Sequence, residues 1–356
     1  MKPKYDIERK IFWECYKNKL PAEIVEQWVQ LAKNSAGSSA SSYANFSINS
    51  KKLIDSNTFY YAVAFYQDKV VCVVPFSMFE RKFFLFRFKQ LHNIDHNQLD
   101  LFTAAGQNEI DSAFLVNSLV SALRVQIDSW HQLVVSNWFL NHKSKSLYFK
   151  FDYRRYSGYY AIEHAKSVSD IIPKKLLKNI ARNEKKLEKA HTNVKLIKVD
   201  NPEQINSALN VFYQIEKSGW KGQNNTAIAC DENIRSFYDK TWNEFASYGN
   251  ACVFVLSAEG KPIASAIAFI HGENLYLHKI AFLETYNSFG AGSILIKQII
   301  KDAIDNQKIQ LISFVTDPEW LKRWHTKKHK LYAVEAFNNN IASKILSFFL
   351  NIMRAL

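Results

Sequence analysis

The sequence predicts an α/β (α+β) protein of two lobes, each with a mixed, mainly antiparallel sheet flanked by helices. The length supports two lobes, because 356 residues are long for one domain and natural for two. The composition, 47% hydrophobic and 14% aromatic, is that of a well-packed globular protein. Helix-like and strand-like segments also occur in mixed order. We expect an N-terminal lobe over residues 1–160 and a C-terminal lobe over residues 161–356 that ends in an apolar helix.

The first lobe begins with an amphipathic pattern over residues 22–33, whose apolar residues recur on one side as in a helix. Two apolar runs flank Gln67-Asp68-Lys69 and indicate two strands joined by a turn. A helix is expected over residues 111–127 and a strand over residues 132–136. Polar and aromatic residues then mix without a clear period over residues 153–170, which marks the break between the lobes.

The second lobe begins with helical patterns and then changes to a period of two. Helices are expected over residues 173–190, 201–217 and 233–247. Strands follow over residues 251–257, 262–270 and 275–282, with short turns between them, and so predict an antiparallel meander. The chain then continues as a small-residue turn, a helix over 291–304, a strand over 309–315, a helix over 318–325 and a strand over 331–337.

The small-residue turn reads Asn287-Ser288-Phe289-Gly290-Ala291-Gly292 and joins the third meander strand to a helix. Glycines let backbone N–H groups close around phosphate oxygens, and a helix N-terminus adds its positive end. The turn lacks the third glycine of a dinucleotide-binding loop and the Gly-Lys-Ser/Thr of a P-loop. We therefore expect a shorter cradle, of the kind that holds the pyrophosphate of an acyl-coenzyme A. The alternative is a turn whose glycines only permit tight packing.

The formal net charge is +13, and two basic runs carry much of it. The first run lies in the 173–190 helix and comprises Lys174, Lys175, Lys178, Arg182, Lys185, Lys186 and Lys189. The second comprises Lys322, Arg323, Lys327, Lys328 and Lys330. Such an excess attracts the phosphates of a coenzyme, of a nucleic acid such as tRNA, or of an anionic membrane. For the first run, an ordinary solvated helix face is the alternative interpretation.

Cysteine usage and the chain ends bear on location. The four cysteines have no paired spacing, which suits a reducing cytoplasm. Residues 1–16 contain no long apolar run, so we expect no secretory signal. Residues 341–356 are strongly apolar but too few to cross a bilayer. This segment either docks on its own protein or lies on a membrane surface, which would be the inner face.

Two pairs of histidines have a spacing that is found in metal sites. His92 with His96 and His325 with His329 have the spacing of helix-borne metal ligands. Neither pair carries the glutamate of a zincin motif, and two lysines lie inside the second pair and repel a cation. The chain has no Gly-x-Ser-x-Gly elbow. We therefore expect neither a metal site nor a serine nucleophile.

Several motifs carry a family resemblance. The end of the 201–217 helix reads Glu216-Lys217-Ser218-Gly219-Trp220-Lys221-Gly222, and Thr226-Ala227-Ile228 and Phe237-Tyr238 follow. Further along are His278-Lys279 on the third meander strand and Tyr286 before Gly290-x-Gly292, and the first lobe has Val74-Pro75-Phe76. With these motifs and this element order, most of the chain resembles the bacterial FemAB-like, CelD-type tandem GNAT N-acetyltransferases. One departure is Asn287, which stands where Gln or Arg is usual.

The resemblance implies two GNAT-like lobes, with the coenzyme bound by the second. The implied reaction moves an acyl group, acetyl in the simplest case, from acyl-CoA to an amine by direct attack. The acceptor would be a small metabolite or an envelope-sugar precursor in polysaccharide biosynthesis. Two alternatives stay open: a Fem-type transferase that draws on aminoacyl-tRNA, and a non-catalytic membrane-surface or nucleic-acid-binding protein on a decayed GNAT fold.

The resemblance also implies roles for individual residues. The coenzyme would be bound by Asn287, Gly290, Ala291, Gly292 and Ser293. The catalytic candidates are Glu216, His278 and Lys279, with Glu284 and Asp317 as further possible bases. The acceptor would contact Trp220, Lys221, Tyr286 and Lys322. A backbone N–H near residues 279–281 would face the thioester carbonyl, and a water could protonate the thiolate, because the 318–325 segment has no tyrosine.

For several of these residues a structural role is the alternative. His278 could be a satisfied core histidine, and Glu216 a salt-bridge partner. Lys279 could be a surface lysine whose stem covers apolar neighbours. Trp220 could be a buried aromatic residue rather than a substrate platform.

Overall fold

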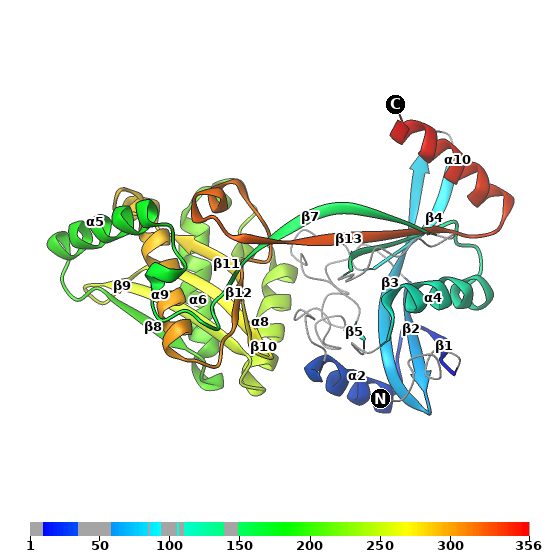
Figure 1. The fold of residues 1–356 in the computed structure, drawn as a ribbon, viewed down its shortest axis with the longest axis horizontal. Helices are drawn as coiled ribbons and strands as arrows, with labels where there is room; N and C mark the ends of the chain where they lie inside the picture. Colours follow the sequence, from blue (N-terminus) through cyan, green and yellow to red (C-terminus); the bar gives the residue numbers. More distant parts are fainter. Residues whose placement is uncertain are drawn as a thin grey trace. The chain divides into compact units, whose positions relative to one another are not determined.

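The computed structural model describes residues 10–34, 58–84, 86–93, 105–106, 110–138 and 149–355. The chain forms two compact units, and the expected mixed α/β class is confirmed (Figure 1). Unit 1 comprises Met1–Arg155 and Lys330–Leu356, and unit 2 comprises Tyr156–His329. The chain therefore crosses between the units twice, once near residue 155 and once near residue 330.

Unit 1 is built on an antiparallel meander. Its elements are β1 (Phe12–Lys17), α2 (Ala22–Asn34), β2 (Phe59–Tyr66), β3 (Lys69–Phe83), β4 (Phe86–His92), β5 (Ala105–Gly106), α4 (Ser112–Gln126), β6 (Gln132–Trp138), β13 (Lys327–Phe337) and α10 (Ile341–Ala355). Within this unit the strands follow the order β1-β2-β3-β4-β6-β13, and β4 and β6 are parallel. The strand pair around Gln67-Asp68-Lys69 is thus confirmed.

Alternate residues of β2 point to opposite faces of this sheet, as the pleat requires. Tyr61 and Val63 pack in a cluster with Trp28 of α2, whereas Ala62 and Ala64 pack in a second cluster with residues of α4. Both faces are therefore covered, which explains why β2 reads as an almost continuous apolar run.

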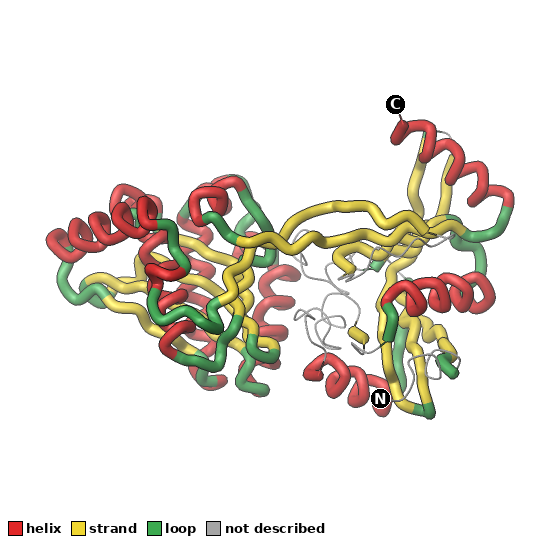
Figure 2. The backbone as a smooth tube through the Cα atoms, viewed as in Figure 1, coloured by secondary structure: helices red, strands yellow, loops and turns green. Residues whose placement is uncertain are grey.

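Unit 2 carries the expected three-strand meander. Its elements are β7 (Phe149–Ala161, shared with unit 1), α5 (Lys174–Ala190), β8 (Lys195–Val199), α6 (Pro202–Ser218), α7 (Trp220–Gln223), α8 (Glu232–Ser247), β9 (Ala251–Ala258), β10 (Lys261–His271), β11 (Asn274–Phe282), the 3₁₀ helix η5 (Glu284–Phe289), α9 (Ala291–Asp305), β12 (Leu311–Ser313) and the 3₁₀ helix η6 (Glu319–Trp324). The strand order is β7-β12-β11-β10-β9-β8. Helices cover both faces of this sheet (Figure 2).

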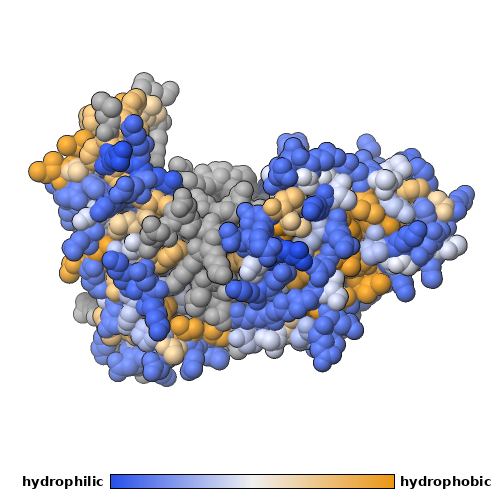
Figure 3. All heavy atoms as spheres, turned by 180° about the vertical axis from the view of Figure 1, so that it is seen from behind, coloured by the Kyte–Doolittle hydropathy of each residue, from blue (hydrophilic) through white to orange (hydrophobic). Residues whose placement is uncertain are grey.

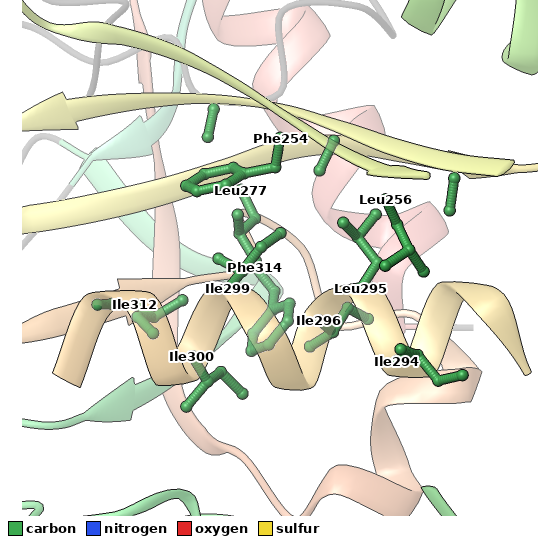
Figure 4. Packing of buried hydrophobic residues seen from close by; sticks show 14 of the residues in the cluster. Phe254, Leu256, Leu277, Ile294, Leu295, Ile296, Ile299, Ile300, Ile312 and Phe314 are labelled. Carbon is green, nitrogen blue, oxygen red and sulfur yellow. The ribbon is translucent and has the colours of Figure 1, made fainter. Parts of the chain in front are cut away.

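The core of unit 2 lies between α9 and one face of the meander. Leu295, Ile296 and Ile299 of α9 are buried against Phe254 and Leu277 of the sheet (Figure 4). On the opposite face, Trp242 of α8 is fully buried and its Nε1–H donates to the carbonyl of Ala268 (3.1 Å). This packing on both faces fixes where α9 begins, and hence where the small-residue turn lies.

The last strand and helix differ from the sequence expectation, which gave all of residues 161–356 to the second lobe. Lys330–Leu356 belongs to unit 1. The physical reason is strand pairing: β13 runs antiparallel to β6, from Tyr332 opposite Trp138 to Phe337 opposite Gln132. The division also falls at residues 155 and 156 rather than 160 and 161.

Three further differences are local. Residues 153–170, expected as a break between the lobes, contain the second half of β7. The mixed polar and aromatic sequence of this strand hides its alternation. The helix expected over residues 318–325 is the shorter 3₁₀ helix η6 (Glu319–Trp324), which His325 caps in a left-handed conformation (φ 51°). The sequence patterns did not predict the strands β1 and β8. None of the helices in the described part of the chain has the length and apolar character needed to cross a bilayer.

We expect Ile299→Ala to lower the free energy of unfolding by about 3 kcal/mol, because it leaves a cavity in a close-packed core. Ile299 is fully buried, whereas Ile197 on β8 is 39% exposed. The control Ile197→Ala should therefore cost less than half as much. Urea unfolding followed by tryptophan fluorescence measures both, and equal costs would contradict this assignment of the core.

Candidate active site

In the sheet of unit 2, the strands β11 and β12 separate after a short stretch of pairing. β11 pairs in parallel with β12 only over three residues, Asn274–Tyr276 with Leu311–Ser313. β11 then continues to Phe282, still paired with β10 on its other side. Beyond Tyr276, the edge of β11 that faces away from β10 has no strand partner among the described residues.

A β-bulge lies in this open stretch. Ala268 of β10 is opposite Leu277, and the next residue, Ile267, is opposite Lys279, so His278 is the extra residue on β11. Bulges redirect a side chain and often occur next to active sites. Here the bulge turns His278 towards α8, where its Nε2 lies 2.9 Å from the Tyr238 hydroxyl. The ring centroids of His278 and Trp242 are 5.3 Å apart.

His278 is an uncharged imidazole at neutral pH. Burial lowers its pKa well below the usual value, and the nearby charges of Lys279 and Lys221 lower it further. Its Nδ1 is out of contact with solvent and has no hydrogen-bond partner in the described structure. A buried ring nitrogen without a partner is costly, and this makes it a candidate for a functional role.

Glu216 is buried at the end of α6, and both of its oxygens are engaged. Oε1 accepts from Lys221 Nζ (2.7 Å), and Oε2 accepts from the Ile228 N–H (2.9 Å). The carboxylate therefore holds the α6–α7 corner together. Lys279 lies on the other side of the bulge, with Nζ 5.7 Å from the centre of the Tyr238 ring.

The small-residue turn forms as a 3₁₀ helix, η5, followed directly by α9. Gly290 joins them in a left-handed conformation (φ 66°), which glycine adopts without strain. Its N–H donates to the Asn287 carbonyl (2.8 Å), and its own carbonyl accepts from the Ser293 N–H (2.9 Å). The N–H groups of Ala291 and Gly292 have no hydrogen bond in the described structure. The helix N-terminus thus presents two free amides.

Cationic side chains from two other elements border these amides. A guanidinium N–H of Arg323, on η6, donates to Ser293 Oγ (2.9 Å). Lys186 of α5 donates to the Ser288 carbonyl (3.4 Å) and lies 4.9 Å from the centre of the Phe289 ring. Both residues belong to the basic runs in the sequence, but no local motif linked them to the turn. Asn183 of α5 also reaches Gly290, since an added Cβ there would lie 2.6 Å from its Nδ2.

The expected acceptor residues lie in different settings. Trp220 is 60% exposed, and its backbone N–H donates to Glu284 Oε1 (3.0 Å), which ties α7 to η5. Lys221 joins the cluster around Glu216. Tyr286 is half-buried, with its ring 5.2 Å from that of His191. Lys322 forms an exposed ion pair with Glu319 (2.8 Å) on η6.

The further candidate bases contact other protein groups, and the histidines of the second pair lie on different elements. Glu284 is the acceptor for the Trp220 amide, and Asp317 is ion-paired with Lys328 (2.5 Å). His325 ends η6 and His329 lies on β13, so the two do not share a helix. His96 lies outside the described residues. No group of three metal-ligating side chains occurs in the part of the chain that the structure describes.

Comparison with known proteins agrees with this arrangement. Residues 174–324 match the family model of the acetyltransferase (GNAT) domain. The fold of the chain is similar to that of FemX (TM-score 0.59, 10% identity, 91% of this chain and 98% of that chain). It is also similar to a conserved protein of unknown function from Bacteroides thetaiotaomicron VPI-5482 (TM-score 0.59, 13% identity, 92% and 100%). No curated protein sequence matches the chain.

These findings place the second unit in a class. Residues 174–324 form a GNAT-type domain, so the protein is an acyltransferase. The likeness to FemX spans both units and confirms the FemAB-like architecture at the level of the fold.

The glycines of the Ser218–Gly222 motif differ in what surrounds them, and this gives a paired test. An added Cβ at Gly222 would lie 1.7 Å from the Lys217 carbonyl oxygen, whereas at Gly219 the nearest atom is 3.6 Å away. We expect Gly222→Ala to cost more than about 3 kcal/mol of stability, since backbone must move. Gly219→Ala should cost less than about 1 kcal/mol. Thermal unfolding measures both, and equal midpoints would contradict the corner geometry.

The lowered pKa of His278 predicts a pH dependence of stability. The unfolded chain takes up a proton on this residue below pH 6.5, while the folded protein does not. The stabilising contribution is therefore complete above pH 6.5 and decreases as the pH falls. As the pH falls below 6.5, wild type should therefore lose more stability than His278→Phe. Urea unfolding across this range tests it, and parallel curves for the two proteins would contradict it.

Proposed function

We propose that unit 2 is an acyl-CoA-dependent N-acyltransferase. It would move an acyl group, acetyl in the simplest case, from the coenzyme A thioester to an amine of a small metabolite or envelope-sugar precursor. One observation carries the proposal: two amides without a hydrogen-bond partner in the described structure lie at the start of α9, against Phe282 at the end of β11. The four free cysteines agree with a cytoplasmic location for this reaction.

The turn fits a diphosphate in charge and in donors. The amides of Ala291 and Gly292 belong to the first turn of α9, and a helix N-terminus favours an anion. Arg323 and Lys186 add two cations from η6 and α5. Ser293 and Asn287 contribute side chains at the rim, and Gly290 permits the sharp change of direction. When bound there, acyl-CoA supplies the activated thioester.

The reaction itself is a direct transfer of the acyl group from sulfur to nitrogen. The amine nitrogen attacks the thioester carbonyl carbon, so that a C–N bond forms and the C–S bond breaks. A backbone N–H of β11, at Ile280 or Ala281, would face the developing oxyanion. The sulfur leaves as a thiolate and takes a proton from water, while the amine gives up its extra proton.

The bulge region supports loss of the proton from the acceptor. The charge of Lys279 disfavours an ammonium nearby and so favours the neutral, nucleophilic amine, whereas the charge of Lys221 is offset by Glu216. The His278 ring, buried and held by the Tyr238 hydroxyl, stays neutral and so adds no positive charge to this region. The exposed Trp220 ring offers an apolar platform beside this region. Tyr286 and Lys322, which contact other protein groups, would shape the walls of the site.

A second donor is consistent with the same site. A Fem-type reaction would draw an aminoacyl group from tRNA, and the likeness to the fold of FemX and the basic helix α5 favour it. The two donors are separated by what the purified protein retains and binds. Absorbance at 260 nm that disappears after ribonuclease treatment would support tRNA, whereas saturable heat with acetyl-CoA would support the coenzyme.

Ser293→Asp tests the proposal without disturbing the fold. Ser293 is in the first turn of α9, where a carboxylate stabilises the helix but repels a diphosphate. We expect acetyl-CoA affinity, measured by isothermal titration calorimetry, to fall at least about tenfold. The melting temperature should stay the same or rise.

The matched control is Ser293→Asn, which changes the size of the side chain without adding charge. It should bind within about threefold of wild type. Equal affinities for Ser293→Asp and wild type would show that the turn does not hold the diphosphate.

A further inference from the structure

The helix α10 leaves a continuous apolar face uncovered. It buries Ser343 and Leu346 on one side. On the other side, six large apolar residues are between 41% and 77% exposed: Ile341, Ile345, Phe348, Phe349, Ile352 and Met353. Their spacing places them along one side of the helix, which we call the apolar stripe. A contiguous exposed patch of this kind marks an interaction site.

A second exposed feature is the tip of the β3–β4 hairpin, defined by Arg81, Lys82, Phe84 and Arg87. Phe84 is 74% exposed. Lys82 and Arg87 are directly opposite each other in the strand register. Neither has an acidic partner among the residues that the structure describes. An exposed aromatic ring beside unpaired cations is suited to an anionic, partly apolar surface.

The stripe and the hairpin tip are at the same end of the sheet in unit 1. The amide of Asn338, just after β13, donates to the His131 carbonyl (3.0 Å), and the His131 amide donates to the Lys89 carbonyl (2.8 Å). The His131 ring lies 6.0 Å from that of Phe86. The chain therefore enters α10 where β3 and β4 extend towards their turn (Figure 1). Figure 3 shows hydrophobic residues gathered at this end of the unit.

We propose that this end of unit 1 docks on the surface of an anionic phospholipid bilayer. The apolar stripe would lie at the boundary between headgroups and acyl chains, with Phe84 beside it. Lys82 and Arg87 would contact lipid phosphates, and the net charge of +13 would draw the protein to the surface. The same charge opposes pairing of two copies through this face. The docking surface does not depend on the transfer reaction proposed for unit 2.

The test is flotation of the full chain with vesicles of phosphatidylcholine alone and of an equal mixture with phosphatidylglycerol. Wild type should float with the anionic vesicles, and added salt should weaken this binding. Phe348→Ser with Phe349→Ser should lower partitioning at least about tenfold. Lys82→Gln with Arg87→Gln should lower it roughly thirtyfold on anionic vesicles, at about 1 kcal/mol for each charge.

Val125 provides the matched control, because it is 82% exposed on α4 of the same unit. Val125→Ser should partition as wild type does, and circular dichroism should show that every variant is folded. The proposal is overturned if wild type does not float, or if the Phe348/Phe349 variant floats equally well. It is also overturned if sedimentation shows a wild-type dimer that this variant dissociates, because a second copy would then cover the stripe.

Discussion

The separation of β11 from β12 after Tyr276 is the constraint on which the rest of unit 2 depends. It leaves one edge of β11 without a strand partner in the described part of the chain, and it lets the chain pass through η5 into α9 at the end of that edge. Burial of Leu295 and Ile299 against the meander fixes the start of α9. A free helix N-terminus is thereby held beside an open strand edge, so that anion binding and carbonyl polarisation are available in one place.

Two buried polar side chains near this opening differ in their hydrogen bonding. Glu216 uses both oxygens to fix the α6–α7 corner. His278, pushed out of register by the bulge, keeps one ring nitrogen bonded to Tyr238 and the other without a partner. The charge of the neighbouring Lys279 favours an uncharged amine, which is the state that attacks a thioester. The α6–α7 corner held by Glu216 and the bulge of β11 at His278 thus have different roles in unit 2.

Local patterns were enough to predict the meander, the turn and the helix after it, because period and glycine placement are recorded within a few residues. They could not show that β13 pairs with β6, since that contact joins segments about 200 residues apart. They also missed β7, whose polar and aromatic residues obscure its alternation. In the site, Gly290 and His278 stood out by position, whereas Arg323 and Lys186 reach the turn only through tertiary packing.

The central claim is that the free amides of Ala291 and Gly292 bind the diphosphate of a coenzyme. Titration of isotope-labelled protein with acetyl-CoA, followed by amide nitrogen–proton correlation spectra, tests it most directly. The account predicts large shifts for these two amides and smaller ones for Gly290 and Ser293, whose N–H groups already donate within the turn. Saturable shifts confined to other regions, with Ala291 and Gly292 unchanged, would contradict it.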